Sequence, residues 1–202
     1  MPPALKNRGL LVVLEGIDGS GKTTQARRLL RRLRRRGREA AFFREPTRGR
    51  WGREIKRLAA RAGSATPERE LELFVKDRRE NVGKNLVPAL RAGKVVVLDR
   101  YYFSTIAYQG AKGLDTGRIR RMNEAFAVRP DLVLILDVDA EAGLRRIRGR
   151  RTRDELFERA DYLVEVARIF RSFRGPRFVL LDGRGDPRSV ARAVWSFVEP
   201  LL

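Results

Sequence analysis

The stretch Gly16-Ile17-Asp18-Gly19-Ser20-Gly21-Lys22-Thr23 decides the fold class of this chain. It matches the phosphate-binding pattern G-x-x-x-x-G-K-[ST] at every position. A short apolar run at 10–14 precedes it, and residues 21–36, with apolar side chains at helical spacing, follow it. Glycines let backbone N–H groups surround phosphate oxygens, and the positive end of the following helix points at the same place. The sequence therefore predicts a nucleotide-phosphate site.

The chemistry of this loop assigns roles to its last residues. Lys22 is expected to reach the β- and γ-phosphates of ATP, and Thr23 is expected to ligate Mg²⁺. The residues expected to bind ATP are Gly16, Ile17, Asp18, Gly19, Ser20, Gly21, Lys22, Thr23 and Thr24.

Outside the loop, apolar runs alternate with helical segments. The runs at 40–43, 95–98, 132–136 and 177–181 are typical of buried strands, and a helix begins at Thr66-Pro67 and continues to about residue 91 with a bend near Gly83 or Pro88. Shorter helices are expected at 55–62, 103–110, 115–127, 140–148 and 155–174, and from 187 onward. The pattern predicts an α/β chain of one domain, 1–202, with a five-stranded parallel sheet between two helical layers.

Composition excludes several kinds of chemistry. The 202 residues include 45 Lys and Arg, 25 Asp and Glu, no cysteine and no histidine, for a net charge of +20. Disulfides, Cys/His zinc sites and histidine-dependent catalytic triads are thereby excluded. No apolar run reaches the roughly 18 residues that span a membrane. The run at 10–14 is too short for a secretory signal, so we expect a cytoplasmic protein. Because 38 of the basic residues are arginine, the charge indicates either a polyanionic partner or a compositional bias.

Two strand-end carboxylates are candidates for positioning a metal. Asp99 follows the run 95–98, and Asp137 follows 132–136, so the apolar pattern cannot choose between them. Arg100 and Tyr101, an anion-binding and an aromatic residue, come directly after Asp99. They favour Asp99 at the site, whereas Asp137 is expected to end its strand and cap the next helix.

Four motifs together resemble the thymidylate kinase family. Residues 99–110, DRYYFSTIAYQG, resemble its D-R-Y/H-x-x-S-x-x-A-Y-Q-G motif, and 15–25 resemble its phosphate-binding loop. Residues 44–46, REP, and 74–78, FVKDR, resemble two further elements, in the family's order. The resemblance spans essentially the whole chain. It implies the three-layer P-loop kinase fold, phosphoryl transfer from ATP to dTMP with Mg²⁺, and a homodimer.

The same resemblance implies a role for each matching residue. On the acceptor side, Phe74 would stack on the thymine ring, and Arg78 would form a hydrogen bond to a thymine carbonyl. Thr105 and Gln109 would lie at the edge of the base, and Arg100 would hold the phosphate. Asp18 would contact the 3′-hydroxyl of the sugar, and Phe157 would pack against the sugar. On the donor side, Lys22 would stabilise the transferred group, Thr23 and Asp99 would hold the metal, and Glu45 would lie near both the metal and the acceptor.

Two departures from the family pattern concern phosphate contacts. Gly19 stands where some members carry an arginine, so the catalytic arginine is expected from the basic lid at about 145–154, with Arg150 favoured over Arg148. Lys56 stands where an arginine commonly contacts the acceptor phosphate, and lysine keeps the charge but loses the bidentate fork. The segment 154–158 also matches with a shift, which leaves the register of the lid open.

Three alternatives stay open at this point. The acceptor could be another nucleoside monophosphate or a deoxynucleoside; the chain could be a nucleic-acid-binding ATPase; or it could bind nucleotides without catalysis. The intact loop and the motif around Asp99 and Arg100 favour a kinase acting on ATP and dTMP, with neither nucleic acid nor membrane as partner. The absence of histidine is compatible with that reaction, because a phosphate oxygen is already an anion and needs no general base.

Overall fold

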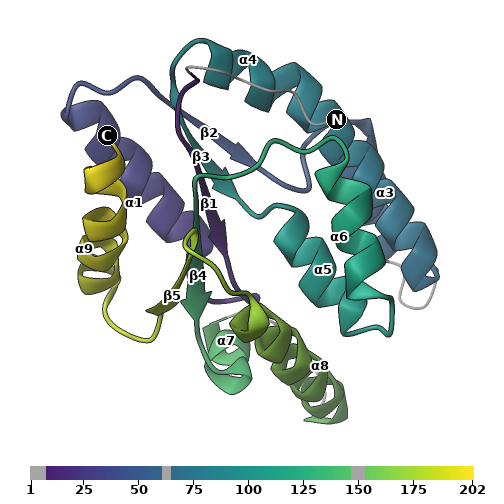
Figure 1. The fold of residues 1–202 in the computed structure, drawn as a ribbon. Helices are drawn as coiled ribbons and strands as arrows, with labels where there is room; N and C mark the ends of the chain where they lie inside the picture. The colour runs from purple at the N-terminus through teal and green to yellow at the C-terminus, as the bar shows by residue number, and fades with distance from the viewer. Residues whose placement is uncertain (1–7, 61–64, 147–152) are drawn as a thin grey trace.

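The computed structural model describes residues 8–60, 65–146 and 153–202, with the side chains of 153–159 outside that description (Figure 1). The five strands form one parallel sheet in the order β2-β3-β1-β4-β5. They are β1 Leu11–Glu15, β2 Ala40–Arg44, β3 Val95–Asp99, β4 Leu132–Asp137 and β5 Phe178–Asp182. The α/β fold with a five-stranded parallel sheet is confirmed.

Helices cover both faces of the sheet, which gives the three layers (Figure 1). Side chains alternate along each strand, so Leu11 and Val13 of β1 join one core while Val12 and Leu14 join the other. The second core packs under α1 Lys22–Arg35 and α9 Pro187–Val198. The first packs under α3 Pro67–Asn81, α4 Val87–Arg91, α5 Tyr102–Gly110, α6 Thr116–Glu124 and α8 Arg153–Ser172.

The bend expected near Gly83 takes the form of a π-helical turn, Val82–Leu86, that joins α3 to α4. Pro88 lies just beyond this turn and has no N–H to give to a regular helix, which accounts for an irregularity at this position. At the start of α3, the Thr66 hydroxyl accepts the Arg69 N–H and Pro67 occupies the first turn, as the sequence predicts.

The helix expected at 55–62 is α2, and it begins earlier, spanning Arg50–Ala59. A tertiary contact explains the early start: the Asp77 carboxylate accepts the backbone N–H and the hydroxyl of Thr47, and the Thr47 hydroxyl accepts the Gly49 N–H. These bonds fix the turn that leads into α2. The remaining α-helix, α7, spans Ala140–Arg146, and a 3-10 turn, Glu199–Leu201, follows α9.

The parallel topology brings the phosphate-binding loop after β1 together with the carboxyl ends of β2 and β3. Glu45 donates its backbone N–H to the Asp99 carbonyl oxygen (3.0 Å), and Arg100 donates its own to Leu14 (3.0 Å). Ligand sites in such sheets form at this edge. None of the helices in the described residues is both long and apolar enough to cross a bilayer.

Candidate active site

The phosphate-binding loop depends on backbone conformations that favour glycine. Gly16, Gly19 and Gly21 have φ of 133°, 78° and 93°. A Cβ at Gly19 would lie 2.1 Å from the Gly143 carbonyl oxygen, so the loop also packs against α7 too closely for a side chain. Gly21 precedes α1 without a side-chain cap, which leaves the N–H groups of the first turn available for an anion.

Lys22 occupies the interior of this loop. Its Nζ donates to the carbonyl oxygens of Gly16 (2.9 Å) and Ile17 (2.6 Å), and only 6% of the residue is exposed. Burial, reinforced by the positive charge of Arg100, holds the pKa of Lys22 well below its usual range. A bound phosphate would add negative charge beside the buried ammonium, beyond that of Asp18, Asp99 and Glu15.

Thr23 and Asp99 form the part of the site that fits a divalent cation. The Thr23 hydroxyl donates to Asp99 Oδ2 (2.6 Å). Asp99 is fully buried, and its Oδ1 has no hydrogen-bond partner among the described residues. A buried carboxylate oxygen without a partner, next to a hydroxyl oxygen, is a suitable pair of hard ligands for Mg²⁺, which takes its remaining ligands from water and nucleotide phosphates.

The competing carboxylate, Asp137, has a different environment. Arg171 of α8 donates to both its oxygens through Nε (2.9 and 3.1 Å). This ion pair occupies Asp137 at the β4 end, whereas Asp99 faces Thr23. The geometry thus favours Asp99 over Asp137, although the Arg171 contact could not be predicted from the local sequence.

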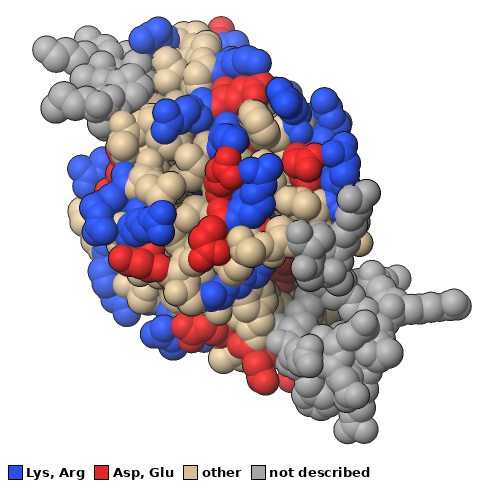
Figure 2. All heavy atoms as spheres, turned by 90° about the vertical axis from the view of Figure 1, so that its right-hand side faces the viewer, with Lys and Arg blue, Asp and Glu red and all other residues tan. Residues whose placement is uncertain are grey.

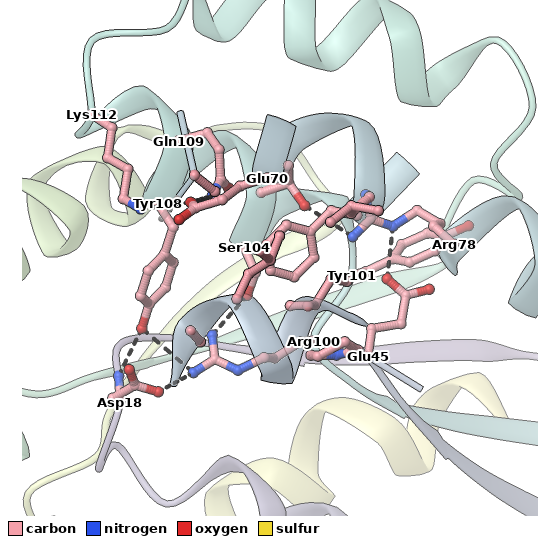
Figure 3. Close-up of a pocket in the computed structure, with 18 of the residues that line it drawn as sticks. Asp18, Glu45, Glu70, Arg78, Arg100, Tyr101, Ser104, Tyr108, Gln109 and Lys112 are labelled. Carbon is pink, nitrogen blue, oxygen red and sulfur yellow. Dashed lines mark hydrogen bonds and ion pairs between the residues drawn. The ribbon is translucent and has the colours of Figure 1, made fainter. Parts of the chain in front are cut away.

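Arg100 connects the phosphate-binding loop to the adjoining pocket. Its guanidinium donates to Asp18 Oδ1 (2.5 Å) and to the Ser104 hydroxyl (3.0 Å), and lies 5.1 Å from the Tyr108 ring centroid. The Tyr108 hydroxyl also accepts the backbone N–H of Asp18 (2.9 Å). Figure 3 shows these side chains converging beside the loop.

The backbone of Arg100 is held in a conformation that is rare outside glycine, with φ of 72°. Glu15, the last residue of β1, stabilises the turn that follows. Its buried carboxylate accepts the backbone N–H of Tyr101 (2.8 Å) and both the N–H and the hydroxyl of Ser104 (3.2 and 2.6 Å). Glu15, at the end of β1, therefore caps the start of α5. By fixing the turn that leads into α5, it also positions Arg100, which precedes this turn.

Beyond Arg100 lies a cavity of about 510 Å³, a size typical of small-molecule sites. Most of the residues that line it come from α2, α3 and α5, and Tyr162 of α8 is also part of the lining. Of the residues predicted for the acceptor, those lining it are Asp18, Glu45, Phe74, Arg78, Arg100, Thr105 and Gln109.

Arg78 lies at the buried end of this cavity, with 1% of its surface exposed. Its three nitrogens donate to Glu45 Oε2 (2.7 Å), Asn123 Oδ1 (2.7 Å) and the Thr105 hydroxyl (3.0 Å). Asn81 donates to the second Glu45 oxygen (3.0 Å). Burial raises the pKa of Glu45, and the Arg78 charge opposes that rise. Both Glu45 oxygens are thus occupied within the protein, so its contact with a metal stays a prediction.

Gln109 lines the same cavity, and one of its side-chain polar atoms has no hydrogen-bond partner among the described residues. Its Nε2 donates to Glu70 (3.1 Å), which also accepts from Lys112 (2.5 Å), while its buried Oε1 has no partner among the described residues. A buried acceptor without a donor is costly, so Oε1 is available for a ligand N–H.

The remaining predicted residues lie elsewhere. Lys56 is exposed on α2 and is absent from the residues lining the cavity, which include its neighbour Ile55. Phe157 belongs to α8, but its side chain is outside the description. Arg148 and Arg150, with most of the expected lid, fall in the undescribed residues 147–152. Their roles stay predictions.

Several site residues had no role assigned from the sequence. Arg44, at the end of β2, lines the cavity, with its Nε 3.7 Å from Asp99. Tyr108 and Ser104 lie within the motif 99–110, so their spacing on one helix was an available signal. Asn123 and Glu70 offered none, because only tertiary contacts bring them to Arg78 and Gln109.

The fold and the site together define a P-loop protein of the nucleotide kinase class, with a cavity beside its phosphate-binding loop. A family model described as thymidylate kinase matches residues 14–194. The chain is 46% identical over 199 residues to a thymidylate kinase of Desulfotalea psychrophila, covering 97% of each chain. It is 41% identical over 193 residues to a probable thymidylate kinase of Archaeoglobus fulgidus (96% of each) and 42% identical over 198 residues to a thymidylate kinase of Xanthomonas oryzae pv. oryzae (98% and 86%). This chain belongs to the thymidylate kinase family.

Proposed function

We propose that the protein transfers the γ-phosphoryl group of ATP to dTMP, giving ADP and dTDP. The observation that carries this proposal is the contact between Arg100 and Asp18, which joins the phosphate-binding loop to the 510 Å³ cavity. A donor phosphate held by the loop and an acceptor phosphate held by Arg100 would then face each other. The family membership supports thymine as the base.

On the acceptor side, the proposed contacts follow from the cavity. Arg100 presents a planar fork that suits a phosphate, and Asp18 lies where a sugar hydroxyl could donate to it. Phe74 offers a ring for stacking on the base. The unpaired Oε1 of Gln109 would accept the N3–H of thymine, since it is a buried acceptor without a donor.

On the donor side, Lys22 would neutralise charge on the β- and γ-phosphates, and Thr23 with Asp99 would hold Mg²⁺. The metal, when bound, would draw negative charge from the phosphate oxygens. Arg150, or Arg148, would add a positive charge over the transferred group from the lid.

The chemical step needs no proton acceptor. An anionic oxygen of the dTMP phosphate forms a bond to the γ-phosphorus, and the bond from that phosphorus to the oxygen bridging to the β-phosphate breaks. The electron pair of the broken bond leaves with ADP. Because the reaction transfers no proton at this stage, Arg100 and Lys22 contribute by position and charge.

A coupled assay with ATP and a panel of acceptors tests this proposal. We expect kcat/KM to be highest for dTMP, lower for dUMP and lowest for dCMP and thymidine. A preference for dCMP or for thymidine would contradict it. For the lid, Arg150→Ala and Arg148→Ala form a matched pair: the catalytic arginine should lower kcat roughly a thousandfold and its neighbour much less. An unchanged kcat in Arg150→Ala would remove that residue from the mechanism.

A homodimer is part of the same proposal. A groove between α3 and α6 is lined by the apolar residues Leu71, Val75 and Met122 and rimmed by charges of both signs. Figure 2 faces this side of the molecule and shows basic and acidic side chains interspersed with uncharged surface. An apolar centre with a charged rim suits a protein interface. Met122→Glu should convert a dimer to a monomer in light scattering, and Arg91→Glu, on exposed α4 surface, should not.

A further inference from the structure

A second concave site lies between α1 and α9, away from the acceptor cavity. Its volume is about 600 Å³, and its lining includes none of residues 16–24 and none of the cavity residues. Seven of the residues that line it are arginines: Arg28, Arg31, Arg32, Arg34, Arg35, Arg188 and Arg192. We call this site the arginine groove.

The arginine groove has no acidic counterpart. None of the residues lining it is Asp or Glu, and none of its seven arginines has a carboxylate within 4.0 Å in the described part of the chain. Acidic charge appears only at its margins, where Glu199 lies 3.5 Å from the neighbouring Arg36 and Asp186 caps α9. The groove therefore concentrates uncompensated positive charge in a concave surface.

Compositional bias alone does not account for this distribution. On α3, which carries basic and acidic residues together, Glu72 accepts from both Arg69 and Lys76, and Glu80 pairs with Lys84 beyond the helix end. Neither α1, Lys22–Arg35, nor α9, Pro187–Val198, contains an acidic residue. Arg69, Lys76 and Lys84 thus have acidic partners, whereas the seven arginines of the groove have none among the described residues.

The floor of the arginine groove limits what could bind there. Leu29 and Val194 are 3% and 1% exposed, and Trp195 is 4% exposed beneath the guanidinium of Arg32, 4.2 Å from the ring centroid. A protein partner would find no accessible apolar anchor, and a base would find no free aromatic ring to stack on. What the groove presents is guanidinium groups, which suit phosphate oxygens.

The spacing of the arginines favours one kind of phosphate chain. Arg28, Arg31 and Arg35 follow one another along α1 at intervals of three and four residues. Successive arginines of this set are therefore separated along the helix axis by about one helical turn, 5.4 Å. Adjacent phosphates of a polyphosphate share an oxygen and lie much closer together. Successive phosphates of a nucleic acid are separated by a sugar, which gives a spacing comparable to the helical turn.

From this charge, shape and spacing we infer that the arginine groove binds the sugar–phosphate backbone of single-stranded nucleic acid without reading its bases. This inference departs from the expectation that nucleic acid is not a partner. It concerns a surface separate from the active site and does not depend on the proposed reaction.

Fluorescence anisotropy with a labelled oligodeoxycytidylate of about 20 nucleotides tests the inference. The groove variant is Arg31→Gln/Arg35→Gln/Arg188→Gln. The matched control, Arg91→Gln/Arg121→Gln/Arg168→Gln, removes the same charge from exposed positions on α4, α6 and α8. We expect the groove variant to bind roughly tenfold more weakly at about 50 mM salt, with a slope of log K against log salt shallower by about 2. The control should change affinity less than about threefold.

Three results would overturn the inference. Equal weakening by the groove and control variants would show that only net charge matters. Displacement of the oligonucleotide by saturating ADP and dTMP would show that it occupies the active site instead. Tight binding of inorganic polyphosphate without binding of the oligonucleotide would assign the groove to polyphosphate. Circular dichroism and the rate of phosphoryl transfer, both expected to be unchanged in the groove variant, verify that it is folded.

Discussion

The phosphate-binding loop and the acceptor cavity meet at Asp18, but they are built in different ways. The loop consists of consecutive residues, 16–23, and its function depends on glycine conformations and one lysine. The cavity collects side chains between positions 18 and 162 into networks. Arg78 alone has partners on α5, on α6 and in the loop after β2. Local backbone geometry makes the first half of the site, and tertiary contacts make the second.

This difference predicts that activity and stability respond differently in the two halves. In the loop, the ammonium group of Lys22 is buried at a cost in stability, in a position that faces bound phosphate. Removing it should lower activity without lowering the free energy of unfolding. In the cavity, the charged groups satisfy one another, and removing one should also weaken the fold. The following substitutions test this contrast.

The largest expected effect is that of Lys22→Met. We expect kcat to fall by roughly a thousandfold or more, because the variant lacks the charge that faces the β- and γ-phosphates. The midpoint of urea unfolding should stay unchanged or rise, because methionine avoids the cost of burying an ammonium group. A large fall in the midpoint would mean that the loop, like the cavity, depends on its ion pairs for stability.

Arg78→Met should act mainly on the fold. It leaves the buried Glu45 carboxylate without its cation, and we expect a loss of about 3 kcal/mol in the free energy of unfolding. The double variant Glu45→Gln/Arg78→Met should recover part of that loss, since it removes the unpaired charge as well. Urea denaturation of both variants measures the difference, and equal stabilities would contradict the ion-pair explanation.

Arg100→Lys lies at the junction and should separate the two substrates. Lysine keeps the charge but cannot reach Asp18 and Ser104 together, so we expect kcat/KM for dTMP to fall roughly a hundredfold. The KM for ATP should change less than about threefold, since the loop itself is intact. Steady-state kinetics with each substrate varied in turn measures both. Equal losses for ATP and dTMP would show that the halves are not separable.

The smallest effect concerns pH. The pKa of Lys22 is lowered in the free protein and should rise when phosphates bind, so ATP binding should take up protons. Affinity for ATP should therefore weaken as pH rises through the lowered pKa. Calorimetry in buffers of different ionisation enthalpy measures the uptake, with Lys22→Met as the control that should lose it. Uptake that persists in this variant would assign the proton to another group.

The contrast also explains how far the sequence could predict the structure. The loop could be predicted residue by residue, because its pattern is contiguous and its glycines are required by the local backbone conformation. The neighbours Arg100 and Tyr101 favoured Asp99 as the metal-positioning carboxylate; the Thr23 contact is compatible with that role, which stays a prediction. The start of α2 was missed because it depends on the bond between Thr47 and Asp77, which are thirty residues apart.

The acceptor side was predictable only in part. The acceptor residues predicted from the sequence had motif support, whereas Asn123 of α6 reaches Arg78 only through the packing of α6 against α3 and α5. No local pattern marks such a residue. Glu15 is similar. In the sequence it indicates only the end of a strand, whereas its role at the start of α5 depends on the parallel pairing of β1 with β3.

The left-handed backbone of Arg100 has a consequence for engineering this enzyme. A non-glycine residue in that conformation costs about 1–2 kcal/mol, which the bonds from Glu15 to the following turn help to offset. A glycine or asparagine at position 100 would remove that backbone cost. It would also remove the ion pair with Asp18 and the arginine that is proposed to hold the acceptor phosphate. Relaxing the backbone at this position would therefore sacrifice both an ion pair and the proposed reaction.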